Sequence, residues 1–152
     1  YEKEGEYHIL FIKRAGRGEY QEGNISFPGR VIGKGETLLA ATLQESFKEL
    51  GLHPQAVEVL GRMDDEVLNN FVISPFVAFI PYPYQFRVNQ QEVEELVPVP
   101  FSELLDPLNL KVRRTTEEEG GLAYFYHIGN RVIRGSTARI LNKLFNLIFG
   151  LE

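Results

Sequence analysis

The sequence predicts a fold that mixes strands and helices, either α+β or an α/β/α sandwich with a mixed sheet. Apolar stretches predict strands early in the chain and again after its middle, while two segments have helical periodicity, one early and one at the end. The chain has 152 residues, of which 43% are hydrophobic and 24% charged, an ordinary globular composition that suits one domain over 1–152. Strands combined with two such helices favour a layered sandwich.

The first strand is expected over residues 6–14, whose sequence is EYHILFIKR, and the Gly-rich polar segment 15–24 follows it as a loop. The next segment, 25–36, holds four turn-forming residues directly before a predicted helix: Pro28, Gly29, Gly33 and Gly35. Free backbone N–H groups in such a turn, at a helix N-terminus, can hold a phosphate.

A helix is predicted from about Thr37 to Leu50. Thr37 suits the N-cap, Gly51 suits a left-handed C-cap, and Pro54 follows shortly. Apolar residues spaced by four, four and three would form the buried stripe of this helix: Leu39, Leu43, Phe47 and Leu50.

The rest of the chain predicts more strands and a second helix. The expected elements are a strand at 56–61, a buried strand at 71–80, a strand leading into a short helical turn within 92–107, and a hairpin turning near Gly120 and Gly121. A last helix, from about Ser136 to Phe149, is apolar on one face. We expect it to pack on the sheet, with a homodimer contact as the alternative.

Composition disfavours several classes of function. Sixteen basic and 21 acidic residues give a net charge of −5, the wrong sign for a protein that binds long nucleic acid by neutralising phosphates. Without cysteine there is no thiolate zinc site, and the three histidines do not stand at metal-ligand spacing. The most apolar stretch, 71–84, is short and interrupted by prolines, and the chain begins without a signal-peptide pattern, so we expect a cytoplasmic protein without a membrane span.

The early helix has an acidic face. Glu45 and Glu49 stand one turn apart, about 40° from each other and roughly opposite the apolar stripe. One interpretation is a pair of solvated surface glutamates, with Lys48 as an i+3 partner of Glu45 and a favourable cation in the last turn. The other is a divalent-cation site beside a phosphate-binding loop, since Mg²⁺ prefers carboxylates together with substrate phosphate oxygens.

The stretch from residue 30 to 52 resembles the Nudix box, G-x5-E-x7-R-E-U-x-E-E-x-G-U, where U is a bulky aliphatic residue. Five positions match: Glu36, Glu45, Glu49, Gly51 and Leu52. Four depart: Arg30 replaces the first glycine, Gln44 the arginine, Ser46 the aliphatic residue, and Lys48 the middle glutamate of the metal cluster.

The flanking segments resemble the coenzyme A diphosphatase branch of that family. Its upstream pattern, LLTxR(S/A)x3Rx3Gx3FPGG, is matched by Leu10, Arg14, Ala15, Gly23, Phe27, Pro28 and Gly29, and Ile12, Glu19 and Arg30 depart from it. Residues 89–107 and 134–141 are similar to segments that follow the box in this branch. The resemblance therefore covers nearly the whole chain.

This likeness implies a Nudix-type α/β/α sandwich with a mixed sheet. It further implies Mg²⁺- or Mn²⁺-dependent cleavage of the diphosphate of coenzyme A, a small-molecule substrate, to 4′-phosphopantetheine and 3′,5′-ADP. Glu45 and Glu49 would then be catalytic metal ligands, with Glu45 able to orient or deprotonate the attacking water and Glu36 supporting the box. The expected substrate-binding residues are Arg14, Phe27, Gly29, Arg30 and Lys48.

The departures from the box change its electrostatics. Lysine in place of glutamate at position 48 makes the cluster two charges more positive and should weaken metal binding. Lys48 or Arg30 could instead contact a substrate phosphate. In the family the arginine at position 44 pairs with acidic groups of the box; Gln44 brings no charge, so Glu36 is expected to lose that partner. The alternative function is therefore a binding module for a nucleotide or acyl-coenzyme A that has lost catalysis.

Other charged and aromatic groups have two interpretations each. Glu92, Glu94 and Glu95 offer an additional acidic residue near the metal, or form an acidic turn in water. Lys111, Arg113 and Arg114 could receive the 3′-phosphate of coenzyme A, although the outer face of a strand is favoured. The aromatic run 124–127 could stack on adenine, although a core position is favoured, and a packing role is expected for 27–29.

Overall fold

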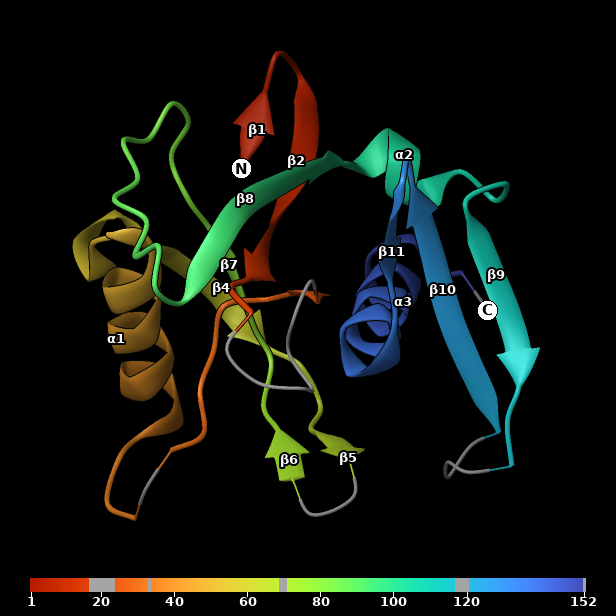
Figure 1. Ribbon diagram of the computed structural model, residues 1–152, viewed down its shortest axis with the longest axis horizontal. Helices are drawn as coiled ribbons and strands as arrows, with labels where there is room; N and C mark the ends of the chain where they lie inside the picture. Colours follow the sequence, from red (N-terminus) through yellow and green to blue (C-terminus); the bar gives the residue numbers. More distant parts are fainter. Residues whose placement is uncertain (17–23, 33, 69–70, 117–120, 152) are drawn as a thin grey trace.

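The computed structural model describes residues 1–16, 24–32, 34–68, 71–116 and 121–151. Its centre is a long antiparallel pair, β2 (Glu6–Arg14) with β8 (Val93–Pro100), in which Leu10 faces Pro98 (Figure 1). β1 (Glu2–Lys3) and β3 (Ile25–Ser26) pair with the two ends of β2. The bounds of β2 are those predicted from the sequence.

The other strands form three smaller antiparallel groups. β9 (Leu110–Arg114), β10 (Leu122–Ile128) and β11 (Arg131–Ile133) make a three-stranded sheet, β4 (Glu58–Arg62) pairs with β7 (Phe76–Phe79), and β5 (Glu66–Leu68) pairs with β6 (Phe71–Ile73). The helical elements are α1 (Leu38–Leu50), a 3₁₀ turn (Pro54–Ala56), α2 (Phe101–Leu105) and α3 (Gly135–Phe149).

Two hydrophobic cores lie on opposite faces of the β2–β8 pair. Successive side chains of a strand point to opposite faces. Phe11 accordingly packs with α3 and β10, and its neighbour Ile12 packs with Leu50 at the end of α1. Figure 1 shows α1 and α3 on the two sides of these strands. The α/β/α sandwich predicted from the sequence is confirmed.

Both caps of α1 are those expected. The Thr37 hydroxyl accepts a hydrogen bond from the backbone N–H of Ala40 at 3.3 Å. Gly51 ends the helix with φ of 66° and donates its N–H to the Phe47 carbonyl at 2.8 Å. A residue with a side chain rarely adopts this left-handed conformation, so glycine defines where the helix stops.

The rotation of α1 differs from the prediction. Its buried residues are Ala41, Glu45, Glu49 and Leu50. Leu50 was predicted to be buried, whereas Phe47, assigned to the same stripe, is 47% exposed. The acidic face is buried because two arginines from the β2 and β3 region meet it, as described below. Solvated surface glutamates were therefore the wrong interpretation of Glu45 and Glu49.

The buried strand expected at 71–80 is instead two short strands, of which the first is exposed. Ser74 and Pro75 separate β6 from β7, and a proline cannot donate a ladder hydrogen bond. Phe71 and Val72, on the β5–β6 hairpin, are each more than half exposed.

The C-terminal half follows the prediction more closely. β8 runs directly into α2, β9 and β10 pair with Leu122 opposite Arg114, and α3 packs against β10. The predicted turn of this hairpin falls partly on residues 117–120, outside the described residues. Among those described, no helix is both long and apolar enough to cross a membrane.

Candidate active site

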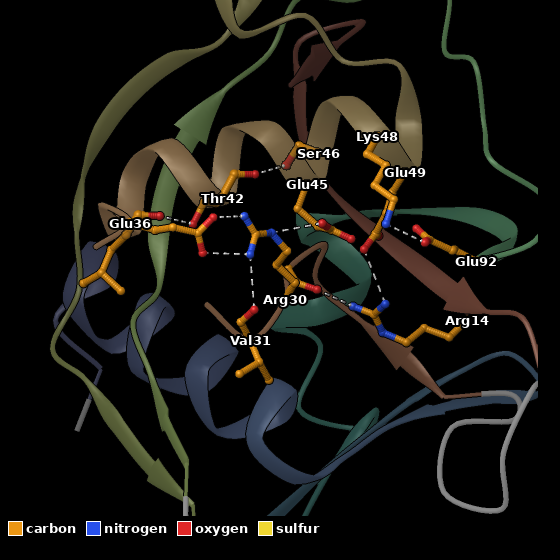
Figure 2. Close-up of polar contacts among 12 residues, drawn as sticks. Arg14, Arg30, Val31, Glu36, Thr42, Glu45, Ser46, Lys48, Glu49 and Glu92 are labelled. Carbon is orange, nitrogen blue, oxygen red and sulfur yellow. Dashed lines mark hydrogen bonds and ion pairs between the residues drawn. The ribbon is translucent and has the colours of Figure 1, made fainter. Parts of the chain in front are cut away.

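Three carboxylates from two distant segments converge at the C-terminal half of α1 (Figure 2). Glu45, Glu49 and Glu92 each place one oxygen within 4.8 Å of the others. Glu45 is 6% exposed and Glu49 is 1% exposed, so both charges are withdrawn from water. Of the three acids proposed after the box, only Glu92 joins this cluster.

The end of α1 determines where Glu92 lies. The last carbonyls of a helix lack partners within the helix. Here the Glu49 carbonyl accepts from the backbone N–H of Asn89, and the Leu50 carbonyl accepts from that of Arg87, both at 2.8 Å. The segment leading to Glu92 is therefore held directly against the helix terminus. Gly51 permits this approach.

The carboxylates have unsatisfied oxygens. The Oε2 atoms of Glu49 and Glu92 are buried, and no described residue forms a hydrogen bond with either. Burial, followed by the interaction with the Glu45 carboxylate, raises the pKa of Glu49 to about 7, against the opposing effect of Arg14. A buried polar atom without a partner is costly in a folded protein, so these two oxygens are available to hold a cation.

Arg14, at the end of β2, joins Glu49 to the loop before α1. One guanidinium nitrogen lies 3.5 Å from Glu49 Oε1. The others donate to the Ser26 hydroxyl at 3.1 Å and to the carbonyls of Phe27 and Gly29 at 3.3 and 3.2 Å. The guanidinium thus holds the FPG segment beside the acid cluster.

Arg30 provides the charge that position 44 lacks. Its two terminal nitrogens donate to both oxygens of Glu36, at 2.7 and 3.1 Å, while its Nε lies 3.3 Å from Glu45 Oε2 (Figure 2). Gln44 is exposed. Position 44 therefore offers Glu36 no charged partner, as expected, but an arginine from the loop, which the sequence did not predict as its partner, replaces the arginine absent from the helix.

Lys48 lies at the edge of the cluster. Its Nζ is 2.9 Å from Glu92 Oε1, and its side chain is 60% exposed. The hydrogen bond with Glu92 is the main reason that the pKa of Lys48 is raised. The ammonium therefore pairs with the outermost of the three acids and is not placed between Glu45 and Glu49.

The remaining candidates lie elsewhere or serve packing. Phe27 stacks on Phe11 at 5.1 Å between ring centroids, as expected for a packing residue, and Tyr126 is buried in the core. Glu94 pairs with Lys13 and Glu95 with Arg131. The basic residues of β9 belong to a strand on the side of the molecule away from α1 (Figure 1). Gly33 is outside the described residues.

A family model described as the NUDIX domain matches residues 1–118. The chain belongs to the Nudix family. Relatives named Uncharacterized Nudix hydrolase NudL are 28% identical in Enterobacter sp. (strain 638) and 29% identical in Klebsiella pneumoniae (strain 342) and Salmonella newport (strain SL254). Each alignment spans 143 residues, covering 90% of this chain and 72% of the relative. Nudix membership supports a pyrophosphohydrolase, and the family acts on small-molecule diphosphates, generally with divalent metal ions.

Proposed function

We propose that this chain is a metal-dependent pyrophosphohydrolase that cleaves the diphosphate of coenzyme A or of a related nucleoside diphosphate derivative. The observation that carries the proposal is the convergence of three carboxylates, two of them buried, with two oxygens that no described residue satisfies. A buried carboxylate oxygen without a partner is costly, and a bound cation would satisfy it.

The donor set suits Mg²⁺ or Mn²⁺. Both ions accept carboxylate oxygens and retain positions for substrate oxygens and water. Glu45, Glu49 and Glu92 would hold the ion, and the raised pKa of Glu49 indicates that Arg14 does not fully compensate the burial of this one carboxylate. When bound, the ion neutralises charge on the diphosphate and activates a water molecule.

The chain's own groups divide the remaining work. Glu45 would orient the attacking water or accept its proton, while Arg30 keeps the Glu45 carboxylate oriented from the side. Water would add to one phosphorus, and the other phosphate would leave with the bridging oxygen. Arg14 positions the 26–29 loop, which contains the proposed substrate contacts Phe27 and Gly29. The same guanidinium contacts Glu49, so it links these two residues to the acid cluster.

Coenzyme A is proposed as the substrate because of the upstream sequence pattern. Arg14, Phe27 and Gly29 belong to that pattern, and Arg14 links it physically to the acid cluster. The Nudix relatives support hydrolysis of a diphosphate but their names specify no substrate.

A second candidate function is that of a binding module that no longer hydrolyses its ligand. The ion pairs Arg30–Glu45 and Lys48–Glu92 favour it, because cations of the chain already neutralise two of the proposed metal ligands. Under this alternative the protein would bind the diphosphate without cleaving it.

Metal-dependent turnover distinguishes the two. The purified protein is incubated with coenzyme A and either Mn²⁺ or Mg²⁺, and 3′,5′-ADP and 4′-phosphopantetheine are followed by chromatography. Panels of other nucleoside diphosphate derivatives test the substrate class. We expect product only with added metal, and a loss of roughly two to four orders of magnitude in kcat/KM for Glu49→Gln.

Glu94→Gln is the matched control, because Glu94 is an exposed glutamate paired with Lys13 outside the cluster. It should retain wild-type turnover. Binding of coenzyme A without product in wild-type protein would support the binding module. Turnover by Glu49→Gln equal to wild type would contradict the assignment of the site.

A further inference from the structure

We propose that Lys48 takes the place of a second divalent cation, so that the cluster binds one Mg²⁺ or Mn²⁺ and the Lys48 ammonium contacts the diphosphate beside it. This inference rests on the proposed function. It concerns how the positive charge at the site is divided between metal and protein.

The first argument is the balance of charge at the cluster. Each of the three carboxylates faces one cation of the chain: Glu45 faces Arg30 at 3.3 Å, Glu49 faces Arg14 at 3.5 Å, and Glu92 faces Lys48 at 2.9 Å. Glu36 shares Arg30 with Glu45, so four acids meet three cations and one negative charge is in excess. An excess this small favours one bound dication over several.

The second argument concerns which oxygens remain available. Two carboxylate oxygens, Oε2 of Glu49 and Oε2 of Glu92, are buried and receive no hydrogen bond from the described residues. The other oxygen of Glu92 holds the ammonium. Glu92 thus has one oxygen that receives no hydrogen bond and one that pairs with Lys48. Because Glu92 belongs to the cluster, the ammonium lies beside the proposed ion site.

The third argument is that the three cations differ in their freedom to move. Arg14 is held by three further acceptors and Arg30 by a bidentate pair with Glu36. Among the described residues, Lys48 forms one ion pair, with Glu92, and its side chain is 60% exposed. A lysine stem of four carbons can swing without disturbing the backbone. Among these cations, Lys48 is the one able to turn from its acid to an incoming phosphate.

The number of Mn²⁺ ions bound per chain tests this directly. Isothermal titration calorimetry and equilibrium dialysis measure it, with and without methylene diphosphonate, a diphosphate that cannot be hydrolysed. We expect one Mn²⁺ per wild-type chain under both conditions. Lys48→Glu should bind a second Mn²⁺ when the diphosphonate is present, because it replaces a cation with a ligand.

Two further variants complete the experiment. Lys48→Gln removes the charge without adding a ligand, so it should still bind one Mn²⁺ but bind the diphosphonate roughly tenfold more weakly. Lys13→Glu makes the same charge change at the comparable Lys13–Glu94 pair, 3.0 Å long and outside the cluster. It should match wild type in both measurements, and thermal unfolding of each variant verifies folding.

The outcomes separate this inference from the proposed function. Two or more Mn²⁺ per wild-type chain would overturn the role of Lys48 and leave a metal-dependent hydrolase intact. One Mn²⁺ in both wild type and Lys48→Glu, or unchanged diphosphonate affinity in Lys48→Gln, would also overturn it. No Mn²⁺ uptake by wild type in either condition would remove the proposed function itself.

Discussion

Glu49 should destabilise the protein at neutral and alkaline pH when divalent metal is removed. Its pKa is raised from 4.5 to about 7 in the folded chain, chiefly because the carboxyl is buried. The folded state therefore keeps a proton on Glu49 between these values, whereas the unfolded state has released it. Stability is lost as pH rises through this window and stays low above it.

The magnitude follows from the shift. A displacement of about 2.5 pKa units, at about 1.4 kcal/mol each, corresponds to roughly 3 kcal/mol. Glutamine resembles the protonated carboxyl, so Glu49→Gln should stabilise the protein in EDTA by up to that amount at pH 8. At pH 4, where glutamate is protonated in both states, the two proteins should be nearly equal.

Urea unfolding from pH 4 to 8 in EDTA measures this difference, with Glu94→Gln as an exposed control expected to stay within about 0.5 kcal/mol of wild type. Added Mn²⁺ should reverse the order, because only wild type retains the full ligand set. A Glu49→Gln variant no more stable than wild type at pH 8, or equally stabilised at pH 4, would refute the reasoning.

Three other predictions concern two sets of ion pairs and the end of α1. Arg30→Gln should lower the melting temperature measured by scanning calorimetry, because it removes the partner of Glu36 and Glu45. Adding Gln44→Arg to this variant should recover part of the loss. A single variant that melted like wild type would contradict this prediction. Gly51→Ala should lower the free energy of unfolding in urea by roughly 2–3 kcal/mol, because φ is 66° and a Cβ there would lie 2.7 Å from the Arg87 Cβ. Gly129→Ala, at φ of 60° with open space around it, should lower it by about 1 kcal/mol. Equal losses would exclude the contact with Arg87 as the cause. Glu66→Ala should lower the free energy of unfolding by roughly 2–4 kcal/mol, because it leaves Arg139 and Lys143 of α3 without the 5%-exposed acid that pairs with them. Unchanged stability would show that these ion pairs contribute nothing.

The sequence predicted correctly those elements whose formation depends on residues close together along the chain. The strand at 6–14 and the caps of α1 depend on neighbouring residues alone, and all appear where expected. The 71–80 segment shows the limit of such reasoning. Its apolar content predicts a buried strand, yet Pro75 interrupts pairing and the packing of the whole chain leaves Phe71 exposed.

The acid cluster required tertiary information. The sequence identified Glu45 and Glu49 as a pair but placed them on the outer face of their helix, since periodicity gives the spacing of a stripe and cannot say which stripe meets the sheet. It offered Glu92 as one of three equivalent acids. Hydrogen bonds from the segment before Glu92 to the end of α1 decide which of these acids reaches the site.

The sequence by itself determined the family, the first long strand, the two long helices and the pair of acids on α1. The folded structure decided which charges meet: Arg30 replaces the arginine missing at position 44, and Lys48 pairs with Glu92 instead of entering between Glu45 and Glu49. The physical reason is that a residue's type and spacing act over one or two turns of chain, whereas the energy of an ion pair depends on distances between segments that only the completed fold brings together.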